Sequence, residues 1–259
     1  MIKYIASDLD GTLLQNGALE LSPRIFDLIL QLSQRGIHFI SASGRQYSNQ
    51  RLLFAPVKDE ISYIAENGSL CLHNHEVIAR GLIERDLGLR IVDAIRELPG
   101  CHCLLSCESR CYTDSTDPQF IWHMQNILKY DMEIVKDLFD INEPFLKMAV
   151  CDFKGTQDIS PLFSERFKSE IKVATSGNIW VDFITPNANK GTGLAAILGH
   201  LGISPQDGIA FGDQYNDVEM LKLAGISYAM VNAAPGIADY ADRTTASVED
   251  ELEKLLSEL

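Results

Sequence analysis

Two aspartates stand two residues apart at the end of a short apolar run near the start of the chain. Asp8 and Asp10 follow the β-type run of residues 3–7, and Gly11 comes directly after them. Alternate side chains of a strand point the same way, so both carboxylates start on one face at the strand end. Two like charges held so close disfavour each other's ionisation, and a divalent cation removes that cost. An Asp-Gly turn that only ends a strand is the alternative at this point.

A second carboxylate cluster follows the short apolar run of residues 208–211. Its first member is Asp213, with Asp217 four residues further on. If this run is a strand beside the first one, Asp213 meets Asp8 and Asp10. Oxygen-only ligands of this kind suit a hard cation that keeps several waters, so Mg²⁺ is the expected metal.

Two further residues supply groups that could hold an anion. Lys190 stands just before a predicted helix and would bring positive charge into an otherwise acidic site. Ser43 follows a predicted strand, where its hydroxyl and the next backbone N–H groups could bind an anion near a helix start. A carboxylate nucleophile, Mg²⁺, a lysine, a hydroxyl and N–H donors together describe phosphoryl transfer through an aspartyl-phosphate.

The elements that must position these residues alternate between strand and helix in the first and last parts of the chain. Apolar spacing predicts helices over residues 23–35, 47–54, 190–201, 217–223 and 248–256, and strands over residues 37–41, 63–65, 208–211 and 226–230. This alternation predicts an α/β fold with a Rossmann-like parallel-sheet core, in which ligands collect at the carboxyl ends of the strands.

The middle of the chain has a different pattern. A hairpin is expected over residues 68–79, turning at 73–76, and we interpret His73 and His75 as solvated turn residues. Helices at 87–98, 118–128 and 159–168, with strands at 101–105, 145–151, 171–175 and 179–184, then predict an α+β module. We therefore expect a core domain of residues 1–81 and 186–259, with an inserted cap of residues 82–185 that acts as a lid.

Composition excludes several classes of partner. The chain has 259 residues, 46% of them hydrophobic, and a formal net charge of −14, which argues against nucleic acid as a partner.

We see no targeting segment and no apolar stretch long enough to cross a membrane. We therefore expect a cytoplasmic protein with reduced cysteines, which is a monomer or a weak homodimer. The cysteines of the middle module lack a paired C-x-x-C framework, so we expect packing rather than metal binding by Cys101, Cys103, Cys107 and Cys111.

Four segments, in order, resemble the motifs of the haloacid dehalogenase superfamily. They are residues 8–13 (DLDGTL), 43–45 (SGR), 190–191 (KG) and 212–217 (GDQYND). Residues 65–68 (AENG), 189–191 (NKG), 219–221 (EML) and 229–233 (AMVNA) are similar to the Cof-type, sugar-phosphatase-like branch. The resemblance covers nearly the whole chain and implies a Rossmann-like core with an α/β cap between the second and third motifs.

The resemblance also implies roles for individual residues. Asp8 would be the nucleophile, while Asp10 would protonate the leaving alcohol, activate the hydrolytic water and turn its backbone carbonyl to Mg²⁺. Ser43 and Lys190 would bind the phosphoryl oxygens. The implied metal ligands are Asp8, Asp10 and Asp213, with Asp217 in support. Further candidates for contact with phosphate or substrate are Leu9, Gly44, Arg45, Asn189 and Asn216.

Together with these residues, the resemblance implies a Mg²⁺-dependent phosphatase that hydrolyses small phosphorylated metabolites, such as sugar phosphates. A phosphosugar mutase with the same aspartyl-phosphate chemistry is the nearest alternative. A non-catalytic regulator that binds a phosphometabolite is a third. Residues 191–196 also match a G-x-G-x-x-A dinucleotide fingerprint, but residues 185–190 separate them from the preceding strand, and that motif needs a tight turn.

Overall fold

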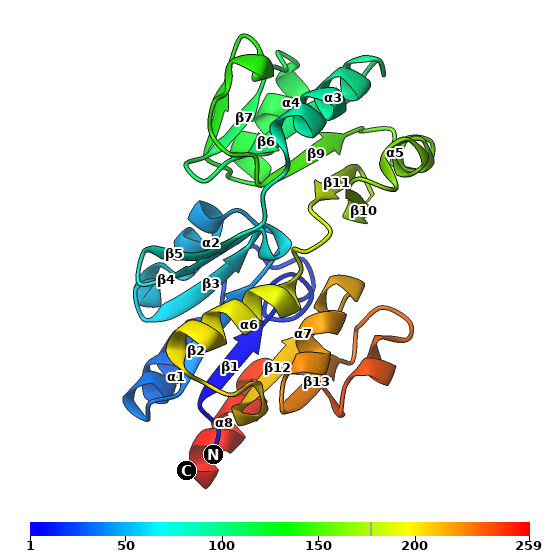
Figure 1. Ribbon diagram of the computed structural model, residues 1–259. Coiled ribbons are helices and arrows are strands. Elements are labelled where there is room, and N and C mark those ends of the chain that lie inside the picture. The colour runs from blue at the N-terminus through cyan, green and yellow to red at the C-terminus, as the bar shows by residue number, and fades with distance from the viewer. Residues whose placement is uncertain (177) are drawn as a thin grey trace. The chain divides into compact units, whose positions relative to one another are not determined.

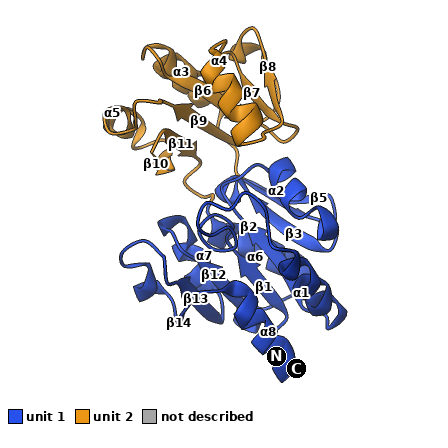
Figure 2. Ribbon diagram, turned by 180° about the vertical axis from the view of Figure 1, so that it is seen from behind, with its two compact units in different colours: residues 1–80, 189–259 blue, residues 81–188 orange. Residues whose placement is uncertain are grey.

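The computed structural model describes residues 1–176 and 178–259, which form two compact units. The core domain consists of Met1–Arg80 and Asn189–Leu259, and the inserted domain of Gly81–Ala188 (Figure 2). The core domain is therefore assembled from two stretches of chain that are far apart in the sequence, and each domain is described by itself below.

The core sheet has the strand order β14-β13-β12-β1-β2-β3-β4-β5 within the described residues. The strands from β14 to β3 run parallel, and β4 and β5 form an antiparallel hairpin at one edge. The predicted α/β class with a parallel-sheet core is confirmed. The strand bounds are β1 (Tyr4–Ser7), β2 (His38–Ala42), β3 (Ile61–Ala65), β4 (Leu70–His73), β5 (Glu76–Arg80), β12 (Gly208–Gly212), β13 (Ile226–Met230) and β14 (Arg243–Thr245).

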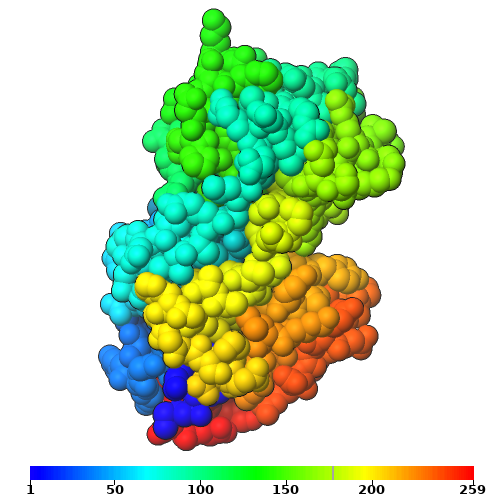
Figure 3. Space-filling view, in the orientation of Figure 1, coloured from blue at the N-terminus to red at the C-terminus, as the bar shows by residue number. Residues whose placement is uncertain are grey.

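Helices cover both faces of this sheet. They are α1 (Pro23–Gln34), α2 (Tyr47–Leu53), α6 (Lys190–Leu201), α7 (Val218–Leu223) and α8 (Val248–Glu258). Helices α1 and α8 pack on one face, and α6 and α7 on the other (Figure 1). Helix α6 reaches the surface beside the β4–β5 hairpin (Figure 3, yellow and cyan). Among the described residues, no helix combines the length and the apolar character that a bilayer crossing needs.

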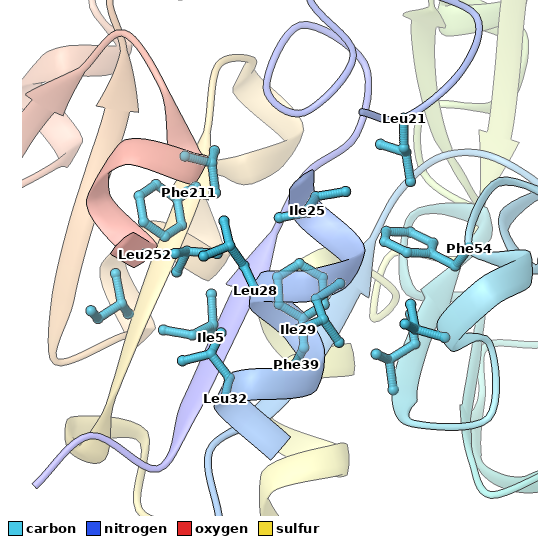
Figure 4. Packing of buried hydrophobic residues seen from close by; sticks show 14 of the residues in the cluster. Ile5, Leu21, Ile25, Leu28, Ile29, Leu32, Phe39, Phe54, Phe211 and Leu252 are labelled. Atoms are coloured by element: carbon cyan, nitrogen blue, oxygen red, sulfur yellow. The ribbon is translucent and has the colours of Figure 1, made fainter. Parts of the chain in front are cut away.

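The packing between α1 and the sheet shows why these residues form these elements. Ser22 caps α1 by accepting a hydrogen bond from the N–H of Arg24, and Pro23 is the first helical residue. One apolar stripe of α1 then faces the sheet, and Figure 4 shows it against Ile5 of β1 and Phe39 of β2. The stripe consists of Ile25, Leu28, Ile29 and Leu32. Helices cover both faces of β1, so all of its residues are buried and its sequence is a short, mostly apolar run. The loop that carries Asp8 therefore begins at a well-packed strand.

The inserted domain is built on a sheet with the order β10-β11-β9-β6-β7-β8. Its strands are β6 (His102–Ser106), β7 (Cys111–Thr113), β8 (Met132–Ile134), β9 (Lys147–Cys151), β10 (Lys172–Ser176) and β11 (Trp180–Ile184). Its helices are α3 (Arg85–Arg96), α4 (Pro118–Trp122), continued by a π-helical segment over His123–Ile127, and α5 (Ile159–Phe167). The apolar pattern predicted β6, β9, β10, β11 and the three helices, but not β7 and β8.

The cysteines of the inserted domain pack as small apolar side chains. Cys103 and Cys107 belong to the larger apolar cluster of this domain, and Cys101 packs against its margin. Cys111 lies in a second cluster with Phe120. All six cysteines of the chain are free thiols. The interpretation of these residues as packing residues is confirmed.

Three histidines and a serine lie together at the amino end of the core sheet. Ser62 Oγ is 2.8 Å from His38 Nε2 and 2.8 Å from His73 Nδ1. The His73 ring also packs against the rings of His38 and His200, with centroids 5.2 and 5.6 Å away. The interpretation of His73 as a solvated turn residue is therefore wrong, because β4 continues through His73 and brings its ring against α6; His75, in the turn itself, is exposed.

This histidine cluster predicts an acid-sensitive core domain. Burial and the neighbouring His73 lower the pKa of His38 to about 4, and burial and His200 lower the pKa of His73, against a small opposing effect of Glu76. A histidine in the unfolded chain has a pKa of about 6.5, so the unfolded state binds more protons below that pH. The stability that the neutral histidines contribute is therefore fully present above about pH 6.5, and it is lost as the pH falls toward about 4.

The expected loss from His38 is about 2 kcal/mol of unfolding free energy between roughly pH 7 and pH 4.5. Urea unfolding at stepped pH, with His38→Gln as the comparison, measures it. The variant should show a shallower fall over this range, and identical pH profiles for the two proteins would contradict the expectation.

Candidate active site

The residues singled out in the sequence gather at the carboxyl ends of the central strands. Asp8 follows β1, Ser43 follows β2 and Asp213 follows β12, and β1 pairs in parallel with both of the other strands. Lys190 is the first residue of α6. Gly11 has φ of 92°, and a Cβ on it would lie 2.2 Å from Asp213 Oδ2. Only a glycine here lets the loop after β1 approach Asp213 so closely.

Lys190 is buried between two carboxylates. Its Nζ donates to Asp8 Oδ1 at 2.5 Å and to Asp217 Oδ1 at 2.6 Å, and all three side chains are almost inaccessible to solvent. Burial alone would lower the pKa of Lys190, but the charges of Asp217 and Asp8 outweigh it and raise that pKa. The ammonium is therefore held in its charged form directly beside Asp8.

Asp217 organises the loop that follows β12. Its Oδ2 accepts hydrogen bonds from the backbone N–H groups of Asp213 and Gln214, both at 2.9 Å, while Oδ1 accepts from Lys190. Both carboxylate oxygens are thus engaged in holding other groups of the site. The role in support of the metal that the resemblance implies for Asp217 stays a prediction.

Three buried carboxylates form a group that could hold a cation. Asp8, Asp213 and Asp217 each offer an oxygen, and these oxygens lie within 4.8 Å of one another. Burial raises the pKa of Asp8 and of Asp213, and the nearby carboxylate of Asp217 adds to both shifts. A bound divalent cation would relieve this repulsion. The two predicted ligands Asp8 and Asp213 both belong to this group, and their carboxylates are hard oxygen ligands of the kind that Mg²⁺ prefers.

The side chain of Asp10 lies outside this carboxylate group. Arg45 donates from Nε and Nη2 to the two carboxylate oxygens of Asp10, at 2.7 and 2.6 Å, and from Nη1 to Asn49 Oδ1 at 2.9 Å. This two-pronged pairing fixes the plane of the Asp10 carboxylate. The predicted roles of Asp10 in proton transfer, and of its backbone carbonyl toward the cation, stay predictions.

The remaining candidates differ in what their side chains contact. The Ser43 hydroxyl is buried and accepts a hydrogen bond from the Arg45 N–H at 3.1 Å. Leu9 is buried in the apolar core, so only its backbone could reach a substrate. Asn189 caps α6, with its Oδ1 accepting from the Thr192 N–H at 2.8 Å. Gly44 lies in the loop after β2, directly between Ser43 and Arg45.

Four other residues support the site without having been assigned a role from the sequence. Thr12 Oγ1 and Gln214 Nε2 donate to the two Asp213 oxygens, at 3.0 and 3.2 Å. Asn232 Nδ2 donates to the Gly11 carbonyl at 2.8 Å, and Asn67 Oδ1 accepts from Asn216 Nδ2 at 2.9 Å. All four lie in segments that carry the family resemblance, but the partners of Thr12, Asn67 and Asn232 are remote in sequence, and no spacing pattern identifies them.

The glycines of the apparent dinucleotide fingerprint are explained by close packing. A Cβ on Gly191 would lie 2.7 Å from Glu219, and one on Gly193 would lie 2.8 Å from Ile64. Both glycines stand in the first turn of α6, where they let the helix approach α7 and β3. Their presence therefore requires no nucleotide.

Comparison with known families identifies the kind of protein to which this arrangement belongs. Residues 5–251 match a family described as haloacid dehalogenase-like hydrolase. The chain belongs to this family. The resemblance seen in the four ordered motifs is thereby confirmed over nearly the full length of this hydrolase.

Curated relatives of this haloacid dehalogenase-like hydrolase include phosphatases. A 5-amino-6-(5-phospho-D-ribitylamino)uracil phosphatase of Escherichia coli is 26% identical, over 98% of this chain and 96% of that protein. An HMP-PP phosphatase of Cronobacter sakazakii is 28% identical, over 91% of this chain and 86% of that protein. These names support the predicted enzyme class, a phosphoric monoester hydrolase.

Solved structures agree with the fold. A structure from Thermotoga maritima superposes with a TM-score of 0.87 at 26% identity, and the match covers 98% of this chain and 97% of that chain. A haloacid dehalogenase-like hydrolase from Bacteroides thetaiotaomicron gives a TM-score of 0.88 at 23% identity, over 98% of this chain and all of that one. The second likeness concerns the fold alone.

Proposed function

We propose that this hydrolase is a Mg²⁺-dependent phosphatase that cleaves small phosphorylated metabolites, such as sugar phosphates, through an aspartyl-phosphate on Asp8. The observation that carries the proposal is the buried contact of Lys190 Nζ with Asp8 Oδ1 at 2.5 Å, beside the carboxylate of Asp213. A carboxylate is a nucleophile for phosphorus only where positive charge offsets its repulsion of the incoming dianion. Lys190 supplies part of that charge.

In the first half of the reaction, Asp8 attacks phosphorus and the ester oxygen leaves. A bond forms between the Asp8 carboxylate and phosphorus as the bond to the leaving alcohol breaks, and Asp10 gives that alcohol its proton. Ser43 and Lys190 bind the phosphoryl oxygens during the transfer. Arg45, which holds the Asp10 carboxylate through two hydrogen bonds, sets the direction from which Asp10 reaches the leaving group.

In the second half, water replaces the aspartate on phosphorus. Asp10, now ionised, takes a proton from the water that attacks the aspartyl-phosphate, and inorganic phosphate and the free Asp8 carboxylate result. Bound by Asp8 and Asp213, Mg²⁺ would lower the repulsion between the carboxylates and the phosphoryl group. Stoichiometric release of inorganic phosphate from a sugar phosphate separates this reaction from that of a phosphosugar mutase.

We assign the inserted domain the role of a cap that selects the leaving group. The curated phosphatase relatives are named for different substrates, a ribitylaminouracil phosphate in one and HMP-PP in the other. Phosphoryl chemistry on Asp8 is the same for any ester, so selection must come from contacts with the rest of the substrate. A screen of phosphorylated metabolites for phosphate release would find the substrate.

Metal removal is the direct test of the Mg²⁺ requirement. We expect EDTA-treated enzyme to lose turnover of p-nitrophenyl phosphate and to recover it on addition of Mg²⁺, because the site is built from hard oxygen ligands. Asp213→Asn should need at least about tenfold more Mg²⁺ for half-maximal rate, a typical effect for loss of a metal-supporting group.

Asp207→Asn is the matched control for this test. Asp207 stands at the opposite end of β12 and pairs with Lys3 at the surface, at 3.0 Å, so the same substitution there should leave the Mg²⁺ requirement unchanged. Full activity of metal-free enzyme would reject the metal site.

A further inference from the structure

Three consecutive residues in left-handed backbone conformations follow β3 directly. Their φ angles are 50° for Glu66, 57° for Asn67 and 96° for Gly68. Glycine adopts this conformation freely and asparagine tolerates it, but glutamate rarely does. Backbone that is held in such a conformation persists only where surrounding contacts require it, and such segments concentrate at functional sites. This left-handed turn, residues 66–68, lies at the same end of the sheet as Asp8 and Ser43.

The left-handed turn holds the loop after β2 at both of its ends. The Asn67 N–H donates to the Ser43 carbonyl at 3.0 Å, and the Glu66 N–H donates to the Arg45 carbonyl at 3.1 Å. Between these two bonds the Asn67 side chain lies over Gly44, where a Cβ would come within 3.1 Å of Asn67 Oδ1. The absence of a side chain at Gly44 therefore lets the Asn67 amide lie against the loop that carries Ser43.

The same turn contacts two further loops of the site. Asn67 Oδ1 accepts a hydrogen bond from Asn216 Nδ2 at 2.9 Å, and Asn216 lies in the loop after β12 with Asp213 and Asp217. A Cβ on Gly68 would lie 2.2 Å from the carbonyl oxygen of Asn189, the residue before Lys190. The loop of Ser43, the loop of Asn216 and the start of α6 thus all contact Asn67 or Gly68.

We infer that Asn67 is a positioning residue for the phosphoryl-binding loops, and this inference rests on the function proposed above. Its backbone N–H fixes the Ser43 loop, and its side-chain amide fixes Asn216 relative to that loop. Groups that bind a phosphoryl dianion must be held within about 0.5 Å of their working positions. Asparagine suits this place because it combines tolerance of the left-handed conformation with an amide oxygen that reaches Asn216.

Asn67→Gly separates the contribution of the Asn67 side chain to phosphate binding from that of its backbone. Glycine keeps the left-handed turn and the bond to the Ser43 carbonyl but removes the amide. We expect the KM for p-nitrophenyl phosphate and the Kd for inorganic phosphate, measured by calorimetry with Mg²⁺ present, to rise by about 2- to 10-fold, the effect of losing one hydrogen bond between neutral amides. The kcat should change far less, and the Tm should stay near that of wild type.

The matched control is Asn74→Gly. Asn74 also has a positive φ, of 46°, but it is exposed in the β4–β5 hairpin turn, at the end of the core sheet opposite to the loops of the site. It should change neither KM nor phosphate affinity. A double-mutant cycle with Asn216→Ala should be strongly non-additive, because the two amides are expected to act through one hydrogen bond.

Unchanged KM and phosphate affinity in Asn67→Gly would overturn the inference, as would full additivity with Asn216→Ala or an equal change in Asn74→Gly. Calorimetry of phosphate binding needs no turnover, so this test does not depend on catalysis. A wild-type protein that binds phosphate but hydrolyses no ester would reject the proposed function, and the effect of Asn67→Gly on phosphate binding would still decide the positioning role.

Discussion

Asp8→Asn is expected to abolish phosphate release from p-nitrophenyl phosphate, with a fall in kcat on the order of 10³-fold or more. The amide has the shape of the carboxylate but cannot attack phosphorus to form the covalent intermediate. The rates of wild type and variant, measured at saturating Mg²⁺ by the release of inorganic phosphate, give the comparison. Turnover retained in Asp8→Asn would contradict the assignment of the nucleophile.

The same variant should fold at least as stably as wild type. Burial raises the pKa of Asp8, as do the charges of Asp217 and Asp213, although Lys190 opposes them, so the ionised carboxylate is unfavourable in the metal-free fold. A neutral amide removes that repulsion and leaves Lys190 paired with Asp217. Metal-free Asp8→Asn should therefore show an equal or higher Tm, which separates lost chemistry from lost structure.

Lys190→Met is expected to lower both the phosphatase activity and the free energy of unfolding. The side chain of Lys190 is 1% exposed and neutralises two buried carboxylates, Asp8 and Asp217. Removing one partner of a buried ionic group leaves uncompensated charge and costs about 3–5 kcal/mol. Urea unfolding of the metal-free proteins should show this loss. Phosphate release should fall as well, because Asp8 would then face the substrate dianion without the ammonium.

The stability deficit of Lys190→Met should shrink as the pH is lowered. Without the lysine, the uncompensated carboxylates take up protons more readily in the folded state than in the unfolded state, so acid favours the folded variant relative to neutral pH. Lys254→Met, on the exposed face of α8, is the matched control and should stay within about 0.5 kcal/mol of wild type. If Lys190→Met unfolded at the same midpoint urea concentration as wild type, the buried ion pairs would contribute nothing to the free energy of unfolding.

Most of the core fold could be predicted because its elements are buried on a recognisable face. The α1 stripe recurs at helical spacing, and β1, β2 and β12 are short apolar runs because helices cover both sides of the sheet. The strands β7, β8 and β14 were not predicted, since each is three residues long and too short to show a period. They form through pairing with neighbouring strands, which local pattern does not reveal.

The candidate site also has a part that the sequence could predict and a part that it could not. Asp8, Ser43 and Asp213 could be placed together from the sequence because the carboxyl ends of neighbouring parallel strands share one edge. The pairing of Arg45 with Asp10 depends on the direction of two side chains in separate loops, which no spacing predicts. The same holds for the bond between Asn67 and Asn216, whose residues stand 149 positions apart.

We expect the phosphoryl group to pass through a covalent acyl phosphate on Asp8. Rapid acid quenching of enzyme mixed with a substrate in the presence of Mg²⁺, followed by peptide mass spectrometry, tests it most directly. We expect one added phosphoryl group on the peptide that contains Asp8, formed faster than phosphate is released, and none in Asp8→Asn. Phosphate release from an enzyme whose Asp8 peptide is never modified, or a phosphoryl group on another residue, would contradict it.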